Sequence, residues 1–139
     1  MGKRKTARKL AMQALYQSDI AQVSVEEAID ELSERESYLV ETVDFARRLA
    51  VNTWAEKDAI DKMIADLSRN WTMDRMGKVI VCVLRLAIYE LLHERDTPKS
   101  VVINEAVELA KKFSTDEASK FVNGILGAFI KGQDKCLRE

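Results

Sequence analysis

The feature that most constrains this chain is the apolar segment at residues 72–92, TMDRMGKVIVCVLRLAIYELL. Between positions 79 and 88, Arg85 is the only residue that is not apolar. A helix on a protein surface keeps one polar face, so a helix that is apolar nearly all round is buried. Charged residues interrupt the segment too often for it to cross a membrane. We therefore predict a central core helix, with Thr72 as its N-cap and Asp74 in its first turn.

A seam of less apolar residues follows one line along this predicted helix. At helical spacing it contains Lys78, Cys82, Arg85, Tyr89 and His93. Since polar groups have no other route out of so apolar a helix, we expect Arg85 and Tyr89 to reach the surface or a partner there.

The composition favours a helical binding protein over an enzyme. Of 139 residues, 47% are hydrophobic and 32% are charged, with one Pro. A single His and the absence of CxxC and HExxH motifs leave a metal ion without ligands. No Gly-rich loop follows a strand pattern, so we expect neither a nucleotide site nor any other cofactor. The N-terminus lacks the apolar segment of a signal peptide, which favours a cytoplasmic protein.

Positive charge is concentrated at the start of the chain. The first 18 residues hold five of the 22 basic residues and no acidic one, which leaves 17 basic against 23 acidic residues elsewhere. The five are Lys3, Arg4, Lys5, Arg8 and Lys9. Residues 5–19 have the apolar spacing of a helix, and cations in its first turns oppose the helix dipole. This cost suggests a phosphate-binding arm; the alternative is a solvated, partly disordered N-terminus.

Two residues further along the same helix have side chains suited to RNA. Gln13 could offer its amide to a base edge, and Tyr16 could offer its ring for stacking. On their own, both are as readily explained as ordinary residues at the boundary of the core.

Capping signals predict where the other helices begin. The signals are the capping boxes starting at Ser24 and Ser114 and the Thr97-Pro98 dipeptide. Residues 38–69 have helical periodicity throughout and form either one bent helix or two. In the last helix, Gly124 and Gly127 lie on one side, which implies close approach by another helix or by the backbone of a ligand.

Four segments carry a resemblance to a known family. They are TARKLAMQALYQSD at the start, VLRLAIYEL in the centre, then DTPKSVVINEAVELAKKFS and SKFVNGIL. In this order and spacing they resemble the NusB family of bacterial transcription antitermination factors, over nearly the whole chain. The resemblance implies an all-α fold of about six to seven helices, in two packed three-helix bundles around a buried central helix. Within a single domain over residues 1–139, the expected parts are 1–71 with the basic arm, 72–131, and a frayed tail over 132–139.

The resemblance also implies a function and partners. It implies a complex with NusE, a small-subunit ribosomal protein, that binds single-stranded boxA-type leader RNA. That complex promotes transcription of ribosomal RNA operons, with other Nus factors and RNA polymerase as indirect partners. A homodimer is possible within the family. The alternative is a helical homodimeric or heterodimeric adaptor that does not bind RNA itself.

Site residues carry over by position. On the RNA side, Arg4, Lys5 and Arg8 match the family's arginine-rich start, with Lys3 and Lys9 beside them, although Thr6 stands where the family usually has a further arginine. Other matched residues on that side are Gln13, Tyr16, Lys120, Phe121 and Asn123.

A second set of residues is assigned to the NusE surface. It comprises Tyr16, Arg85, Tyr89, Glu105 and Glu117. Ile80 stands where some members have an acidic residue that faces NusE. Either that contact is rebuilt here, or Ile80 belongs to the core and the interface depends on its neighbours.

Overall fold

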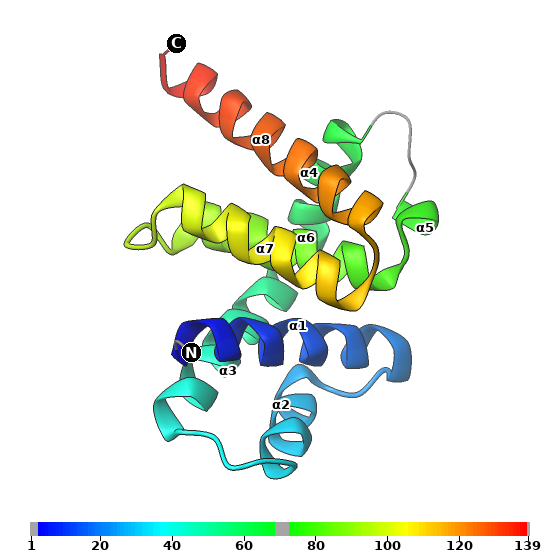
Figure 1. Ribbon diagram of the computed structural model, residues 1–139, viewed down its shortest axis with the longest axis vertical. Helices are drawn as coiled ribbons and strands as arrows, with labels where there is room; N and C mark the ends of the chain where they lie inside the picture. The colour runs from blue at the N-terminus through cyan, green and yellow to red at the C-terminus, as the bar shows by residue number, and fades with distance from the viewer. Residues whose placement is uncertain (1–2, 69–72, 139) are drawn as a thin grey trace. The chain divides into compact units, whose positions relative to one another are not determined.

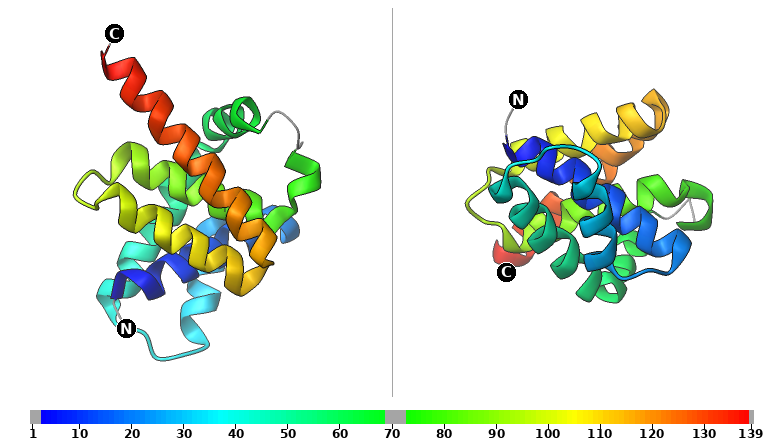
Figure 2. Two further views of the ribbon diagram at one scale, coloured as in Figure 1. Left: turned by 45° about the horizontal axis from the view of Figure 1, so that its top comes forward. Right: turned by 90° about the horizontal axis from the view of Figure 1, so that it is seen from below.

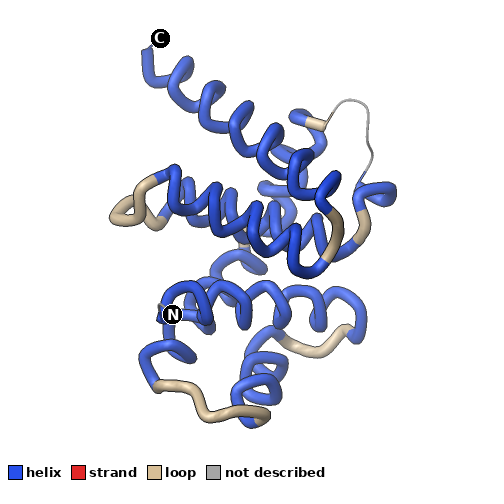
Figure 3. The backbone as a smooth tube through the Cα atoms, in the orientation of Figure 1, coloured by secondary structure: helices blue, strands red, loops and turns tan. Residues whose placement is uncertain are grey.

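The computed structural model describes residues 3–68 and 73–138, which form eight α-helices and no strand (Figures 1 and 3). The all-α prediction is confirmed, and the count exceeds the expected six to seven because one helix is a single turn. The helices are α1 (Lys3–Ala21), α2 (Val25–Glu34), α3 (Val40–Ala55), α4 (Lys57–Leu67), α5 (Met73–Met76), α6 (Lys78–His93), α7 (Lys99–Phe113) and α8 (Asp116–Arg138).

The chain divides into two compact units, Met1–Lys57 and Asp58–Glu139. We had expected the division between residues 71 and 72. It falls earlier, so Asp61 of α4 belongs to the second unit together with α6. There the guanidinium of Arg85 donates from Nε and Nη2 to the two carboxylate oxygens of Asp61, at 2.7 and 2.8 Å.

In the first unit, α1, α2 and α3 pack against one another (Figure 2). The apolar face predicted for α1 is buried as expected, including Leu10 and Leu15. The predicted cap of α2 is confirmed, because the hydroxyl of Ser24 accepts a hydrogen bond from the backbone N–H of Glu27 at 3.0 Å. Residues 38–69 are two helices rather than one bent helix, since α3 ends at Ala55 and α4 begins at Lys57.

In the second unit, α6 is the core helix that the sequence predicted. Every residue from position 81 to position 90 is buried, and α7 and α8 pack on α6 and on each other. The apolar segment is not one continuous helix, however. Gly77 interrupts it with φ 84° and ψ 149°, so Asp74 belongs to the one-turn α5 and not to the start of α6. Thr72, the expected N-cap, lies outside the described residues.

The last helix differs from the sequence prediction at both ends. Its cap is Thr115, whose hydroxyl accepts a hydrogen bond from the N–H of Ala118 at 3.0 Å, and not Ser114. At its other end α8 continues to Arg138, where we had expected a frayed tail. None of the helices in the described part of the chain is long and apolar enough to cross a membrane.

Candidate nucleic-acid interface

The five basic residues of the arm occupy the first two turns of α1 and differ in exposure. Lys3 and Arg4 are exposed, and Lys5 and Lys9 are half-buried. Arg8 is only 4% exposed. The arm therefore presents its charge to solvent mainly through its first two cations, and Arg8 is an interior residue of this fold.

The exposed end of the arm contacts α3. The ammonium of Lys3 donates a hydrogen bond to Glu41 and forms an ion pair with it, and this bond lowers the pKa of the Glu41 carboxyl. Both side chains remain largely in water, with 56% and 72% of their surface exposed, so the pair contributes little to stability.

Arg4 also contacts α3, and here the contact is aromatic. Its guanidinium carbon lies 4.8 Å from the centroid of the Phe45 ring, and that of Arg48 lies at the same distance from the same ring. These side chains line an open hollow of about 600 Å³ in the first unit, together with Lys3, Glu41 and Asp44. The sequence does not identify Phe45 and Arg48 as site residues, because nothing in their spacing indicates that α3 lies beside the arm.

The half-exposed face of α1 continues from the arm. Lys5, Lys9, Gln13 and Tyr16 follow at steps of four, four and three residues within one uninterrupted helix, so they share one stripe. Gln13 is half-buried and Tyr16 is 37% exposed. The stripe thus places an amide and an aromatic ring in line with two cations.

The other predicted RNA-side residues lie together on α8 in the second unit. Lys120 and Asn123 are exposed, and Phe121 is half-buried. Among the residues assigned to NusE, Glu117 is exposed in the first turn of α8 and Glu105 is half-buried on α7. These five side chains all belong to the second unit, whereas the basic arm belongs to the first.

The middle of the seam along α6 is buried, so the expectation that Arg85 and Tyr89 reach the surface is wrong, although Lys78 and His93 at its two ends are exposed. Arg85 is 6% exposed and is held by Asp61; Tyr89 is 5% exposed, with its ring centroid 5.0 Å from that of His93. The apolar segment has no polar face because the fold brings a carboxylate to its arginine. The assignment of Arg85 and Tyr89 to a partner surface therefore loses its basis. Ile80 is 3% exposed and belongs to the core, which is the second of the two interpretations of that position.

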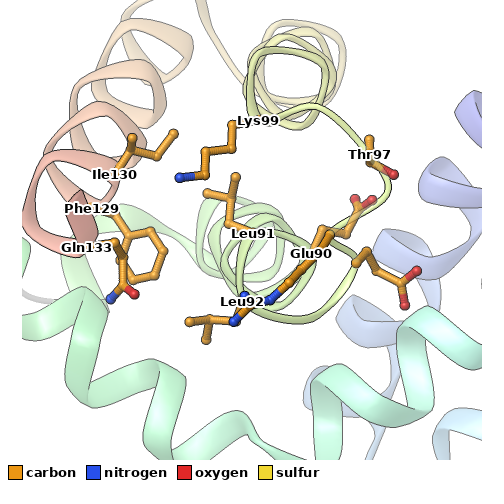
Figure 4. Close-up of a pocket in the computed structure, with 10 residues that line it drawn as sticks. Glu90, Leu91, Leu92, Thr97, Lys99, Phe129, Ile130 and Gln133 are labelled. Carbon is orange, nitrogen blue, oxygen red and sulfur yellow. The ribbon is translucent and has the colours of Figure 1, made fainter. Parts of the chain in front are cut away.

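A smaller cavity of about 200 Å³ lies in the second unit where the end of α6 meets α7 and α8. Figure 4 shows Glu90 and Leu91 of α6 beside Lys99 of α7 and Phe129 and Ile130 of α8. Glu90 is 2% exposed. No group of three or more potential metal-ligating residues occurs in the part of the chain that the structure describes.

These features define a class of protein: an all-helical binding protein whose first helix starts with exposed cations beside an aromatic ring. The family model of the NusB family matches residues 5–131, and the chain belongs to that family.

Individual relatives agree with this membership. The transcription antitermination protein NusB of Symbiobacterium thermophilum is 44% identical over 137 residues, which cover 93% of this chain and 90% of that protein. The protein of the same name from Bacillus subtilis is 43% identical over 124 residues, covering 89% and 92%. A crystal structure of the antitermination factors NusB and NusE in complex with dsRNA superposes with a TM-score of 0.86 at 30% identity, covering 94% of this chain and 97% of that one.

Proposed function

We propose that this protein is a transcription antitermination factor that binds RNA together with NusE, in the cytoplasm and without catalysing a reaction. The observation that carries the proposal is the likeness, over 94% of the chain, to a NusB that was solved with NusE and double-stranded RNA. Relatives more than 40% identical over most of the chain are named for transcription antitermination. The RNA that the family resemblance implies is a single-stranded boxA-type leader, with other Nus factors and RNA polymerase engaged through the complex.

The first helix supports this proposal on physical grounds. Lys3 and Arg4 are exposed at the positive end of the α1 dipole, where cations cost stability and an anion is attracted. Phosphate neutralisation there would supply affinity that does not depend on sequence, while Gln13 and Tyr16 on the same helix would contact bases. Lys120 and Asn123 of α8 would add contacts from the second unit.

The burial of Arg8 changes which residues can contact RNA directly. A side chain that is 4% exposed has its guanidinium committed inside the protein, so it supports α1 and leaves the phosphates to its neighbours. For NusE, the accessible candidates are Tyr16, Glu105 and Glu117, because Arg85 and Tyr89 are interior. An adaptor that used the α6 seam as its binding surface is disfavoured for the same reason.

The test is RNA binding across a salt series, with and without NusE. The RNAs are a single-stranded boxA-type leader, its duplex and an unrelated strand. Lys3, Arg4, Lys5 and Lys9 of the arm together with Lys120 would make about five phosphate contacts, which give a log–log salt slope of roughly −3 to −4 on a single strand. The double variant Lys3→Glu/Arg4→Glu should make that slope shallower by about 1.4 and leave the melting temperature nearly unchanged, because each phosphate contact contributes about 0.7.

A matched control moves the same charges elsewhere. Lys62 of α4 and Arg75 of α5 are exposed, so Lys62→Glu/Arg75→Glu changes the net charge equally but leaves the arm intact. RNA binding by this control variant should have a log–log salt slope close to that of the unaltered protein. Absence of RNA binding by the unaltered chain, both alone and with NusE, would refute the proposed function; NusE binding without any RNA binding would identify the adaptor instead.

A further inference from the structure

Two arginines from different helices share one aromatic ring in the first unit. Arg4 lies at the start of α1 and Arg48 in the middle of α3, and each guanidinium carbon lies 4.8 Å from the centroid of the Phe45 ring. Both arginines are exposed, whereas Phe45 is half-buried. The ring therefore holds two cationic groups at the surface and not in the core.

The surroundings of this ring are shaped to admit an anion. The hollow of about 600 Å³ is open, and its lining includes three cations and two carboxylates, Glu41 and Asp44. Glu41 is paired with Lys3, and both of these side chains remain largely exposed to water. Ion pairs this exposed are weak, so an entering phosphate group can take the place of a carboxylate beside these cations.

Stacking on a ring leaves an arginine able to bind phosphate. A guanidinium that stacks on an aromatic ring does so with its flat face, and its N–H donors, which lie in its plane, can still bind an anion. An unsupported arginine loses rotamer freedom when it grips a ligand, and a ring that already fixes its orientation reduces that loss. Because two guanidinium groups already lie against the Phe45 ring, we expect this ring to orient them and not to stack on a base. Base stacking would then fall to another ring, such as that of Tyr16.

We propose that Arg48 acts with Arg4 to hold neighbouring backbone phosphates of the bound RNA, one phosphate each, and that Phe45 is the positioning residue that orients both guanidiniums. This inference rests on the proposed function, and it extends the RNA surface from the first helix onto α3.

The first test measures the charge that Arg48 contributes. RNA binding in the presence of NusE is followed across a salt series for Arg48→Gln and for Arg47→Gln. Arg47 is the neighbouring arginine, but it pairs with Asp30 at 2.7 Å and does not line the hollow. We expect Arg48→Gln to make the log–log salt slope shallower by about 0.7 and to weaken binding several-fold, with Arg47→Gln close to the unaltered protein.

The second test separates positioning from a structural role. Phe45→Leu should weaken RNA binding about two- to five-fold without changing the salt slope, because the number of cations stays the same. Phe45→Tyr keeps an aromatic ring and should keep the affinity, and melting curves establish that both variants fold. In an Arg4→Gln/Arg48→Gln background, Phe45→Leu should have no further effect on RNA affinity.

The outcomes distinguish this inference from the proposed function. If the unaltered chain binds RNA and Arg48→Gln has the same slope as Arg47→Gln, the inference is overturned and the proposed function stands. A persistent effect of Phe45→Leu in the double-glutamine background overturns the positioning role. NusE binding without RNA should be unchanged in all these variants; its loss would assign the hollow to an acidic segment of that protein. Failure of the unaltered chain to bind RNA would refute both.

Discussion

The two glycines inside α8 give a prediction whose sign is set by the structure. Apart from the adjacent backbone of α8 itself, a Cβ added at Gly124 or Gly127 would meet no described atom within 4 Å, so alanine fits at both positions. Alanine is favoured over glycine inside a helix by about 0.8–1.0 kcal/mol at each site. The double variant Gly124→Ala/Gly127→Ala should therefore raise the free energy of unfolding by about 2 kcal/mol, and the melting temperature by about 6–10 °C.

Gly77 provides the control for this prediction. It also has no described atom within 4 Å of an added Cβ, but its φ of 84° and ψ of 149° fall in a region that is essentially restricted to glycine. Gly77→Ala should lower the free energy of unfolding by about 1–3 kcal/mol. The same side chain enters open space in both cases, so the opposite signs isolate the backbone conformation. Urea and thermal unfolding measure both values.

A fall in stability of the double alanine variant would refute this reasoning, because it would mean that something covers the glycine side of α8 in the free protein. The sequence suggests close approach by another helix or by the backbone of a ligand, and the open space around both positions shows that no other described helix of the second unit makes it. The remaining explanation for the two glycines is close approach by the backbone of a ligand or partner. We accordingly expect the stabilised variant to bind RNA with NusE more weakly than the unaltered protein, as measured by the same salt series.

Two further predictions concern charged groups. Asp61→Ala should lower the free energy of unfolding by about 3 kcal/mol in urea titrations, because it removes the carboxylate from a buried Arg85 while Asp61 itself is 26% exposed. Asp61→Ala/Arg85→Met should cost less than the single change, and a double variant less stable than the single one would contradict the ion-pair account. The Glu31 carboxyl accepts hydrogen bonds from Arg35 and Gln17, and these bonds lower its pKa below the ordinary 4.5. The ionised carboxylate therefore contributes its full stabilisation above about pH 4.5, and this stabilisation is lost as the pH falls further. Glu31→Gln should narrow the stability difference between about pH 7 and pH 3, and an unchanged difference would exclude Glu31 from the acid response.

The sequence predicted those elements whose cause is local. Apolar periodicity identified the inward face of α1, and the serine-to-glutamate spacing identified the cap at Ser24, because each depends on residues within one or two turns. The buried run of α6 was predicted because a helix with almost no polar residues has to lie inside.

The predictions that were wrong or absent depend on contacts between residues far apart in the sequence, which a local pattern does not show. Arg85 and Tyr89 were expected at the surface because polar groups have no other route out of so apolar a helix. The carboxylate that pairs with Arg85 inside the protein, Asp61, is 24 positions away on α4 and is not visible in the pattern of the helix itself. Phe45 and Arg48 were missed for the same reason, since their relation to the arm requires α3 to pack beside α1. The break at Gly77 was missed because a glycine within an apolar segment is also compatible with a continuous helix.

The two ways in which this protein pairs its basic side chains bear directly on function. The Arg85 side chain is 8% exposed and makes two short hydrogen bonds to one carboxylate, so an incoming anion would have to replace both bonds inside the protein. Lys3 and Glu41 meet in water, where an ion pair contributes little, and the guanidinium carbon of the exposed Arg4 lies 4.8 Å from the centroid of the Phe45 ring. A polyanion that approaches the first unit can therefore exchange with the contacts of the arm at little cost, whereas the pair in the second unit is fixed. That difference makes the first turn of α1, together with the part of α3 beside it, the place where phosphate binding is expected.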